Sequence, residues 1–168
     1  MKRTILILAG LLNLSVALMA QSATDPNEGA RLLQDTPNTY TFKWWGRAGR
    51  TYFIQTSSDL FSWFYLNEIE PGQNLIIPYG FNSTAEKFFL RLRYSDIPTD
   101  NPAAADFDGD GLSNAAELLM GTDPLRADSD GDGLSDGNEF LIGRNPLLAD
   151  SPVDGSDRLL DVHTPLAP

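Results

Sequence analysis

The 168-residue chain contains no cysteine, one histidine, and 12 lysines and arginines against 23 acidic residues. The lack of cysteine excludes disulfide bonds, thiol nucleophiles, thiolate zinc sites and iron–sulfur clusters. The formal net charge of −11 argues against a nucleic-acid partner, because phosphates would be repelled. What remains is a chain rich in oxygen donors and poor in every other kind of reactive group.

The sequence also lacks an arrangement of residues that would indicate catalysis. His163 lies in a proline-flanked stretch, and there is no nucleophile elbow and no phosphate-binding loop. Glu68, Glu70 and Glu86 stand singly and do not form the carboxylate pair of a glycosidase. We therefore expect a protein that is not an enzyme.

Long apolar runs are scarce, and the only one occupies residues 5–20, directly after a positively charged start. Polar residues interrupt it, and it is shorter than the ~20 apolar residues that a membrane span needs. We expect residues 1–20 to be a signal peptide cleaved after Ala20, with a membrane anchor as the alternative. The mature protein would then be exported (secreted, periplasmic or at the cell surface) and free of the membrane.

The segment from 37 to 97 has the character of a small β module. Five stretches have the composition of strands, and no helical period of useful length occurs among them. We read 21–36 as a polar linker, and Pro78 limits its strand to an edge or an end of a sheet. The strand candidates are TYTFKWW, RTYFIQTSS, SWFYLNEIE, NLIIPYG and EKFFLRLRYS.

Three motifs in this module, WWGRAGRTY, SSDLFSW and KFFLRLR, resemble a β module of exported bacterial proteins. That module is similar to a short fibronectin type III or immunoglobulin-like sandwich, so the resemblance implies a fold more than a function. For Trp44, Trp45 and Trp63 we keep two interpretations open. They pack in the core or on a sheet face, or they form a stacking platform for carbohydrate.

The acidity belongs to the C-terminal part of the chain. Residues 1–99 contain eight acidic and nine basic residues, whereas residues 100–168 contain 15 acidic and three basic ones. After a linker at 98–105, a 22-residue frame occurs at 106–127 and again at 128–149. A decayed third copy begins at Asp150 and continues into the tail, 151–168. The predicted fold class is mainly β, a small sandwich followed by an irregular arm of loop repeats with short helices.

Each repeat begins with the pattern D-x-D-G-D-G-L-S-[DN]-x-x-E, which is typical of a calcium-binding loop. Calcium takes six to eight oxygen ligands, here from positions 1, 3, 5, 9 and 12 and from the backbone carbonyl of position 7. The alternative of magnesium is disfavoured, because it prefers a rigid octahedron with several waters. The second loop has one carboxylate more, so we expect it to bind calcium more tightly. The predicted ligands are Asp106, Asp108, Asp110, Leu112, Asn114 and Glu117 in the first loop and Asp128, Asp130, Asp132, Leu134, Asp136 and Glu139 in the second.

A short helix is predicted after each loop. Ser113 and Ser135 are suitable N-caps, and Gly121 and Gly143 are suitable C-caps. Prolines lie too close upstream of both loops for the incoming helix of an EF-hand, so each repeat is a loop followed by a single short helix.

The repeats closely resemble bacterial thrombospondin type 3 repeats, in which the loop is followed by G-T-D-P. This sequence has GTDP at 121–124 and GRNP at 143–146. The resemblance implies a calcium-stiffened arm with a spacer or adhesive role, whose partner would be a cell-surface or matrix protein or a glycan. Whether Asp123 binds calcium stays open. The alternative is a recognition module with the repeats as a stalk, similar to a dockerin, although dockerins place aspartate at position 12.

Overall fold

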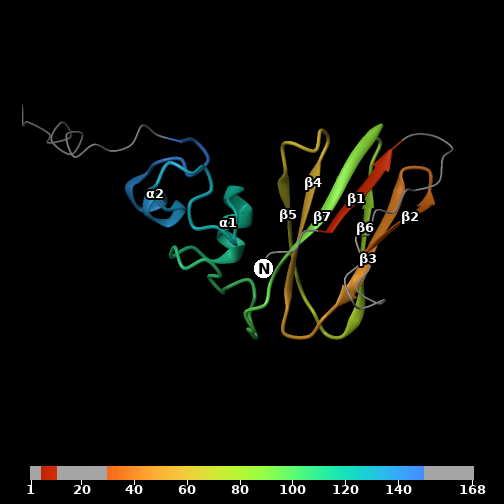
Figure 1. The fold of residues 1–168 in the computed structure, drawn as a ribbon, viewed down its shortest axis with the longest axis horizontal. Coiled ribbons are helices and arrows are strands. Elements are labelled where there is room, and N and C mark those ends of the chain that lie inside the picture. The colour runs from red at the N-terminus through yellow and green to blue at the C-terminus, as the bar shows by residue number, and fades with distance from the viewer. Residues whose placement is uncertain (1–4, 11–29, 150–168) are drawn as a thin grey trace, which may run out of the picture.

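The computed structural model describes residues 5–10 and 30–149, and the predicted mainly β fold is confirmed (Figure 1). Two short helices follow the strands, α1 (Asn114–Met120) and α2 (Asp136–Ile142). Within the described ranges, no helix is both long enough and apolar enough to cross a bilayer. The strands are β1 (Ile5–Gly10), β2 (Arg31–Thr36), β3 (Thr39–Gly46), β4 (Thr51–Ser57), β5 (Phe64–Pro71), β6 (Leu75–Asn82) and β7 (Lys87–Ser95).

The strands form two antiparallel sheets that enclose a hydrophobic core. Sheet A has the order β1-β7-β4-β5, and sheet B has the order β2-β3-β6. Pro78 lies in β6, at an edge of sheet B, as predicted. Trp44 is 1% exposed, so for this residue the packing interpretation holds. The core residues are Ala30, Leu32, Phe42, Trp44, Tyr52, Ile54, Phe88, Leu90 and Leu92.

Two strands lie in segments where we did not expect structure. Arg31–Thr36, which we read as part of a polar linker, is paired with β3 because the preceding Ala30 and the strand residue Leu32 are buried in the core. Asn38, with φ 69°, makes the tight connection between the two strands. Strand β1 lies within the predicted signal peptide, and its backbone pairs with β7.

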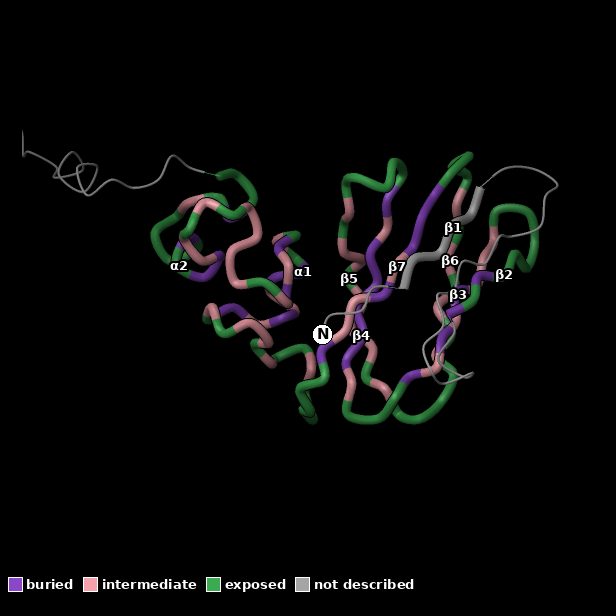
Figure 2. Tube along the Cα trace, in the orientation of Figure 1, coloured by how far each residue is buried: buried purple, intermediate pink, exposed green. Residues whose placement is uncertain are grey.

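The first acidic repeat covers part of the outer face of sheet A and makes a third layer (Figure 2). Side chains alternate along a strand, so Tyr52 and Ile54 enter the core while Phe53 and Gln55 point outward. Yet Phe53 is 0% and Gln55 4% exposed. The ring of Phe107, from the first repeat, lies edge-on to Phe53 with the ring centroids 6.1 Å apart.

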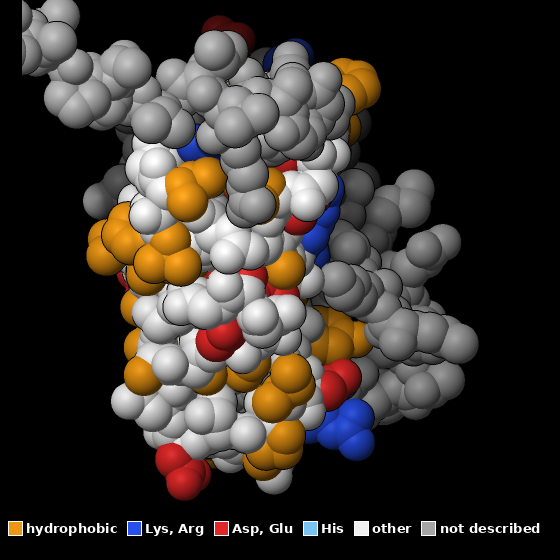
Figure 3. Space-filling view, turned by 90° about the vertical axis from the view of Figure 1, so that its left-hand side faces the viewer, with side chains coloured by type: hydrophobic (Ala, Val, Ile, Leu, Met, Phe, Trp, Pro, Cys, Tyr) orange, Lys and Arg blue, Asp and Glu red, His pale blue; other side chains and the backbone are white. Residues whose placement is uncertain are grey.

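The two repeats differ in how far they are covered. Helix α1 packs against β5, and its Leu118 is buried, with 6% exposure. The residue at the same position of the second repeat, Phe140, is 58% exposed. The side of the arm turned away from the β module therefore displays apolar side chains (Figure 3). The large exposed apolar residues of the second repeat are Phe140, Leu141, Ile142, Leu147 and Leu148.

Candidate metal centre

The first aspartate of each loop fixes the loop's conformation. Asp106 accepts hydrogen bonds from the amides of Gly109 (2.6 Å) and Gly111 (3.0 Å). These glycines have φ of 83° and 99°, values that residues with a side chain rarely adopt. Asp128 repeats both bonds at 2.6 and 3.0 Å. The calcium-ligand positions do not require glycine at the fourth position of the loop, but both copies of the sequence have it.

Three aspartates converge in each loop, as predicted. Each offers one carboxylate oxygen to a group in which all three oxygens lie within 4.8 Å of one another. One oxygen of Asp108 and one of Asp130 are buried without a hydrogen-bond partner. The two groups are Asp106, Asp108 and Asp110, and Asp128, Asp130 and Asp132.

The glutamate at position 12 reaches the loop from the helix. The side chain of Ser113 accepts a hydrogen bond from the Ala116 amide, and this N-cap starts α1 so that Glu117 lies in its first turn. Glu117 is 0% exposed, and neither of its carboxylate oxygens has a hydrogen-bond partner. Glu139, at the equivalent place in α2, is also fully buried. The predicted caps of both helices are confirmed, with Ser135 at the start of α2 and Gly121 and Gly143 at the two ends.

The electrostatics of the first loop call for a cation. Burial, followed by the charges of Asp108 and Asp110, raises the pKa of Glu117 to about 9. Burial and the charge of Asp110 likewise raise the pKa of Asp108 to about 6. A carboxylate buried without hydrogen bonds among like charges is strongly disfavoured. A divalent cation would neutralise it, and an all-oxygen donor set suits a hard ion such as calcium.

The side chains at position 9 make hydrogen bonds within the structure. The side chain of Asn114 accepts from the Phe107 amide at 3.3 Å and donates to the Pro102 carbonyl at 2.7 Å. Asp136 accepts from the amide and the hydroxyl of Ser129, at 2.8 and 2.7 Å. Both residues are 0% exposed and hold the two ends of their loop together.

The extra carboxylate of the second loop, that of Asp136, therefore accepts hydrogen bonds from Ser129. Our expectation that the second loop binds calcium more tightly rested on this carboxylate being a ligand. A direct ligand role for Asn114 and Asp136 stays a prediction, as does that of the Leu112 and Leu134 carbonyls.

The two repeats are joined at the start of α2. Asp110 accepts a hydrogen bond from the Gly137 amide at 2.7 Å, so a predicted ligand of the first loop also holds the next helix. A Cβ atom on Gly137 would overlap the backbone carbonyl of Asp110. In the first repeat the equivalent residue is Ala115, whose amide bonds to the carbonyl of Ala103. The predicted linker 98–105 thus bonds to the start of α1 in the way that the first repeat bonds to the start of α2.

Trp45 and Trp63 are the other two tryptophans for which a carbohydrate-stacking platform is an alternative to packing. The Trp63 indole donates to the Leu60 carbonyl at 3.0 Å, and the guanidinium of Arg91 lies 4.1 Å from its ring centroid. One face of the ring is therefore occupied by a side chain of the protein. Trp45 is partly buried in β3. The packing interpretation accounts for these contacts without a ligand.

The loops define a tandem repeat in which three aspartates of each copy converge and a glutamate of the following helix is buried. In comparisons with known proteins, residues 106–127 and 128–149 each match the family model of the bacterial TSP3 repeat. The match covers the two repeats and not the β module. No curated protein and no solved structure matched the chain.

We expect Gly137→Ala to separate the two repeats, because the added methyl group would overlap the Asp110 carbonyl. The free energy of unfolding of the arm should fall by roughly 1–3 kcal/mol, measured by amide hydrogen exchange. Gly80→Ala is the matched control, since nothing lies within 4 Å of its Cβ position. Equal protection of α2 in both variants would contradict the contact.

Without metal, the arm should lose stability as the pH rises. The pKa of Glu117 is raised from 4.5 to about 9 in the folded chain. The folded arm therefore holds this proton more tightly than the unfolded arm does, and the stabilisation is complete below pH 4.5 and lost towards pH 9. Hydrogen exchange in chelator, corrected for intrinsic rates, should show this decline in the wild type and a much weaker one in Glu117→Gln. The control is Glu86→Gln, at an exposed residue, and a Glu117→Gln variant with the wild-type pH dependence would refute the assignment.

Proposed function

We propose that this protein is an exported, non-enzymatic calcium-binding protein, with a calcium-stiffened repeat arm attached to a β module. The observation that carries the proposal is the buried Glu117 carboxylate, whose oxygens lack hydrogen-bond partners beside three converging aspartates. The likeness of residues 106–149 to the bacterial TSP3 repeat supports the same ion.

In each loop the calcium ligands would include the three aspartates and the glutamate of the following helix. The ion would supply the positive charge that these carboxylates lack, and no other chemistry is required of it. Two like charges ~4 Å apart repel by about 4 kcal/mol at an effective dielectric constant near 20. Because each loop contains several such pairs, the free energy of calcium binding would serve as free energy of folding.

The biological role would be that of a spacer or adhesive element. The β module, with its two antiparallel sheets, would belong with the fibronectin type III or immunoglobulin-like sandwiches that its motifs resemble. A cell-surface or matrix protein or a glycan would be the partner. A calcium-ordered arm would hold the module at a defined place relative to whatever follows the repeats.

Calcium titration tests the proposal. We expect two ions per chain in calorimetry, with dissociation constants on the order of 10⁻⁵ to 10⁻³ M, as in extracellular modules. Order should appear in residues 106–149 as the ions bind. Asp110→Ala should weaken both sites, because Asp110 also holds the Gly137 amide, whereas Asp132→Ala should weaken mainly the second. A stoichiometry below two would defeat the proposal, and a purely local effect of Asp110→Ala would defeat the link between the sites.

Export is a separate part of the proposal, supported by the charged start and short apolar run of residues 1–20. We expect the intact mass of protein from a secreting host to correspond to a chain that begins at Gln21, give or take about three residues. Cleavage would remove β1, so that sheet A would consist of β7, β4 and β5. A chain that retains Met1 would keep β1 beside β7 and would overturn the proposal.

A further inference from the structure

Asp123, the aspartate of the G-T-D-P segment, directs its side chain toward the β module. One oxygen of Asp123 accepts a hydrogen bond from the hydroxyl of Tyr65 at 2.6 Å. The other accepts one from the guanidinium of Arg93 at 3.3 Å. Tyr65 belongs to β5 and Arg93 to β7, so both oxygens of this acidic residue of the first repeat are engaged by the β module.

The contact is largely buried and joins opposite charges. The side chains of Arg93 and Asp123 are 16% and 21% exposed, and burial together with the charge of Asp123 raises the pKa of Tyr65. An ion pair shielded in this way is worth more than one on an open surface. Its loss would leave buried polar groups on both sides without partners.

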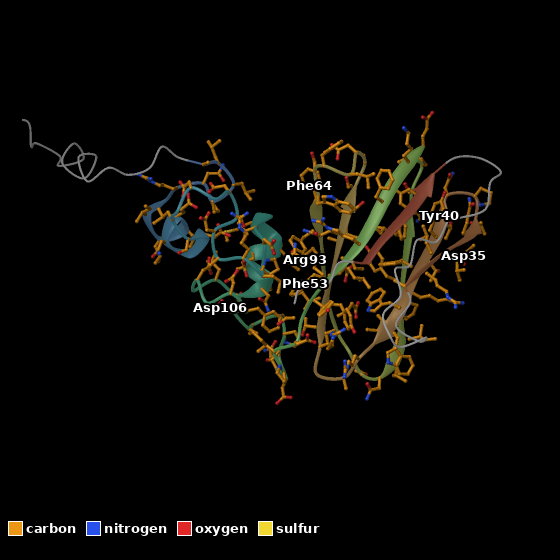
Figure 4. All side chains as sticks on the ribbon, in the orientation of Figure 1. Asp35, Tyr40, Phe53, Phe64, Arg93 and Asp106 are labelled. Atoms are coloured by element: carbon orange, nitrogen blue, oxygen red, sulfur yellow. The ribbon has the colours of Figure 1, made fainter. Side chains whose placement is uncertain are left out.

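An aromatic contact between Phe53 and Phe107 lies next to the ion pair. Phe53 and Arg93 lie on the side of sheet A that faces α1, with Asp106 on the arm opposite (Figure 4). Phe53 and Arg93 are direct neighbours in the pairing of β4 with β7. Phe53 owes part of its complete burial to Phe107, which follows the first aspartate of the calcium loop. The docked surface is thus built from the loop itself as well as from the segment after α1.

Asp123 is in turn positioned by both repeats. The backbone carbonyl of Glu117 accepts from the amides of Gly121 (2.7 Å) and Thr122 (3.0 Å), which fixes the chain just before Asp123. The Asp123 amide donates to the Ser129 hydroxyl at 2.8 Å, and that hydroxyl donates to Asp136. Anything that holds Glu117 in the first loop therefore also holds Asp123 against the sheet.

We propose that Asp123 is not a calcium ligand but the anchor by which the first repeat docks on sheet A, and that calcium in the first loop sets this docking. The proposal rests on the proposed calcium-binding function. When calcium holds Glu117, the end of α1 is ordered and presents Asp123 to Tyr65 and Arg93. Without the ion, no bond holds Glu117 among the aspartates, the end of α1 loosens and the arm leaves the sheet.

The distance between the β module and the second repeat tests this proposal. The chain has no cysteine, so Ala85→Cys and Leu141→Cys give the full-length protein a unique pair of spin labels at two exposed positions. With saturating calcium we expect one narrow distance distribution. In chelator, or in the Tyr65→Phe/Arg93→Gln double variant with calcium, the width should at least double.

Calorimetry on the same proteins separates an anchor from a ligand. Because calcium binding and docking are linked, a variant that loses only the docking also loses some calcium affinity, and an anchoring Asp123 predicts that Asp123→Asn weakens calcium binding no more than the double variant does. Tyr79→Phe, in β6 of the other sheet, is the control and should change neither readout. The proposal is overturned by a loss of affinity in Asp123→Asn at least tenfold greater than that in the double variant, by an unchanged width in the double variant, or by a narrow distribution in chelator. A parent chain that binds no calcium would instead refute the proposed function.

Discussion

The arm is governed by the repulsion among carboxylates that its own backbone brings together. The glycines at positions 4 and 6 turn each loop tightly, and the three aspartates then have oxygens within 4.8 Å of one another. The following helix adds a fully buried glutamate to each loop. Few apolar side chains of the arm are buried, so packing alone offers little against repulsion of this size. The geometry is stable only with a proton or a cation among the carboxylates, and this one condition links the fold of the arm to its chemistry.

The same condition extends into the β module. The outward side chains of β4 and β7 include Phe53, Gln55, Arg91 and Arg93, which are unsuited to a face that is simply exposed to water. The first repeat covers Phe53 with the ring of Phe107 and pairs Arg93 with the carboxylate of Asp123. The nearly neutral N-terminal part of the chain and its strongly acidic C-terminal part therefore meet at the positively charged face of sheet A.

The local features of this fold could be predicted from the sequence because their causes are local. The caps at Ser113, Ser135, Gly121 and Gly143 follow from turn chemistry, and the three aspartates of each loop converge because the backbone between them is short. Pro78 lies at a sheet edge because proline has no amide hydrogen to donate.

The features that could not be predicted depend on contacts that are distant in the sequence. Strand β2 has a polar composition and is held in place by core contacts of Ala30 and Leu32. Nothing in the sequence near Phe53 indicates that Phe107, more than fifty residues later, will bury it. Asn114 and Asp136 fit the calcium pattern, but their hydrogen bonds to the second residue of each loop become visible only when the chain is folded.

The contact between Gly137 and Asp110 has a consequence for how such an arm can be extended. A repeat that follows another must bring its helix start against the preceding loop, and only a residue without a side chain fits there. A repeat that follows a plain segment of chain, as the first one does, can have alanine at the same place. The residue after position 9 therefore distinguishes an opening unit from a continuing one. If a second copy of the first repeat were inserted directly after the first repeat, the alanine of the inserted copy would have to become glycine. Copies of the second repeat, which already has glycine there, could be added in series.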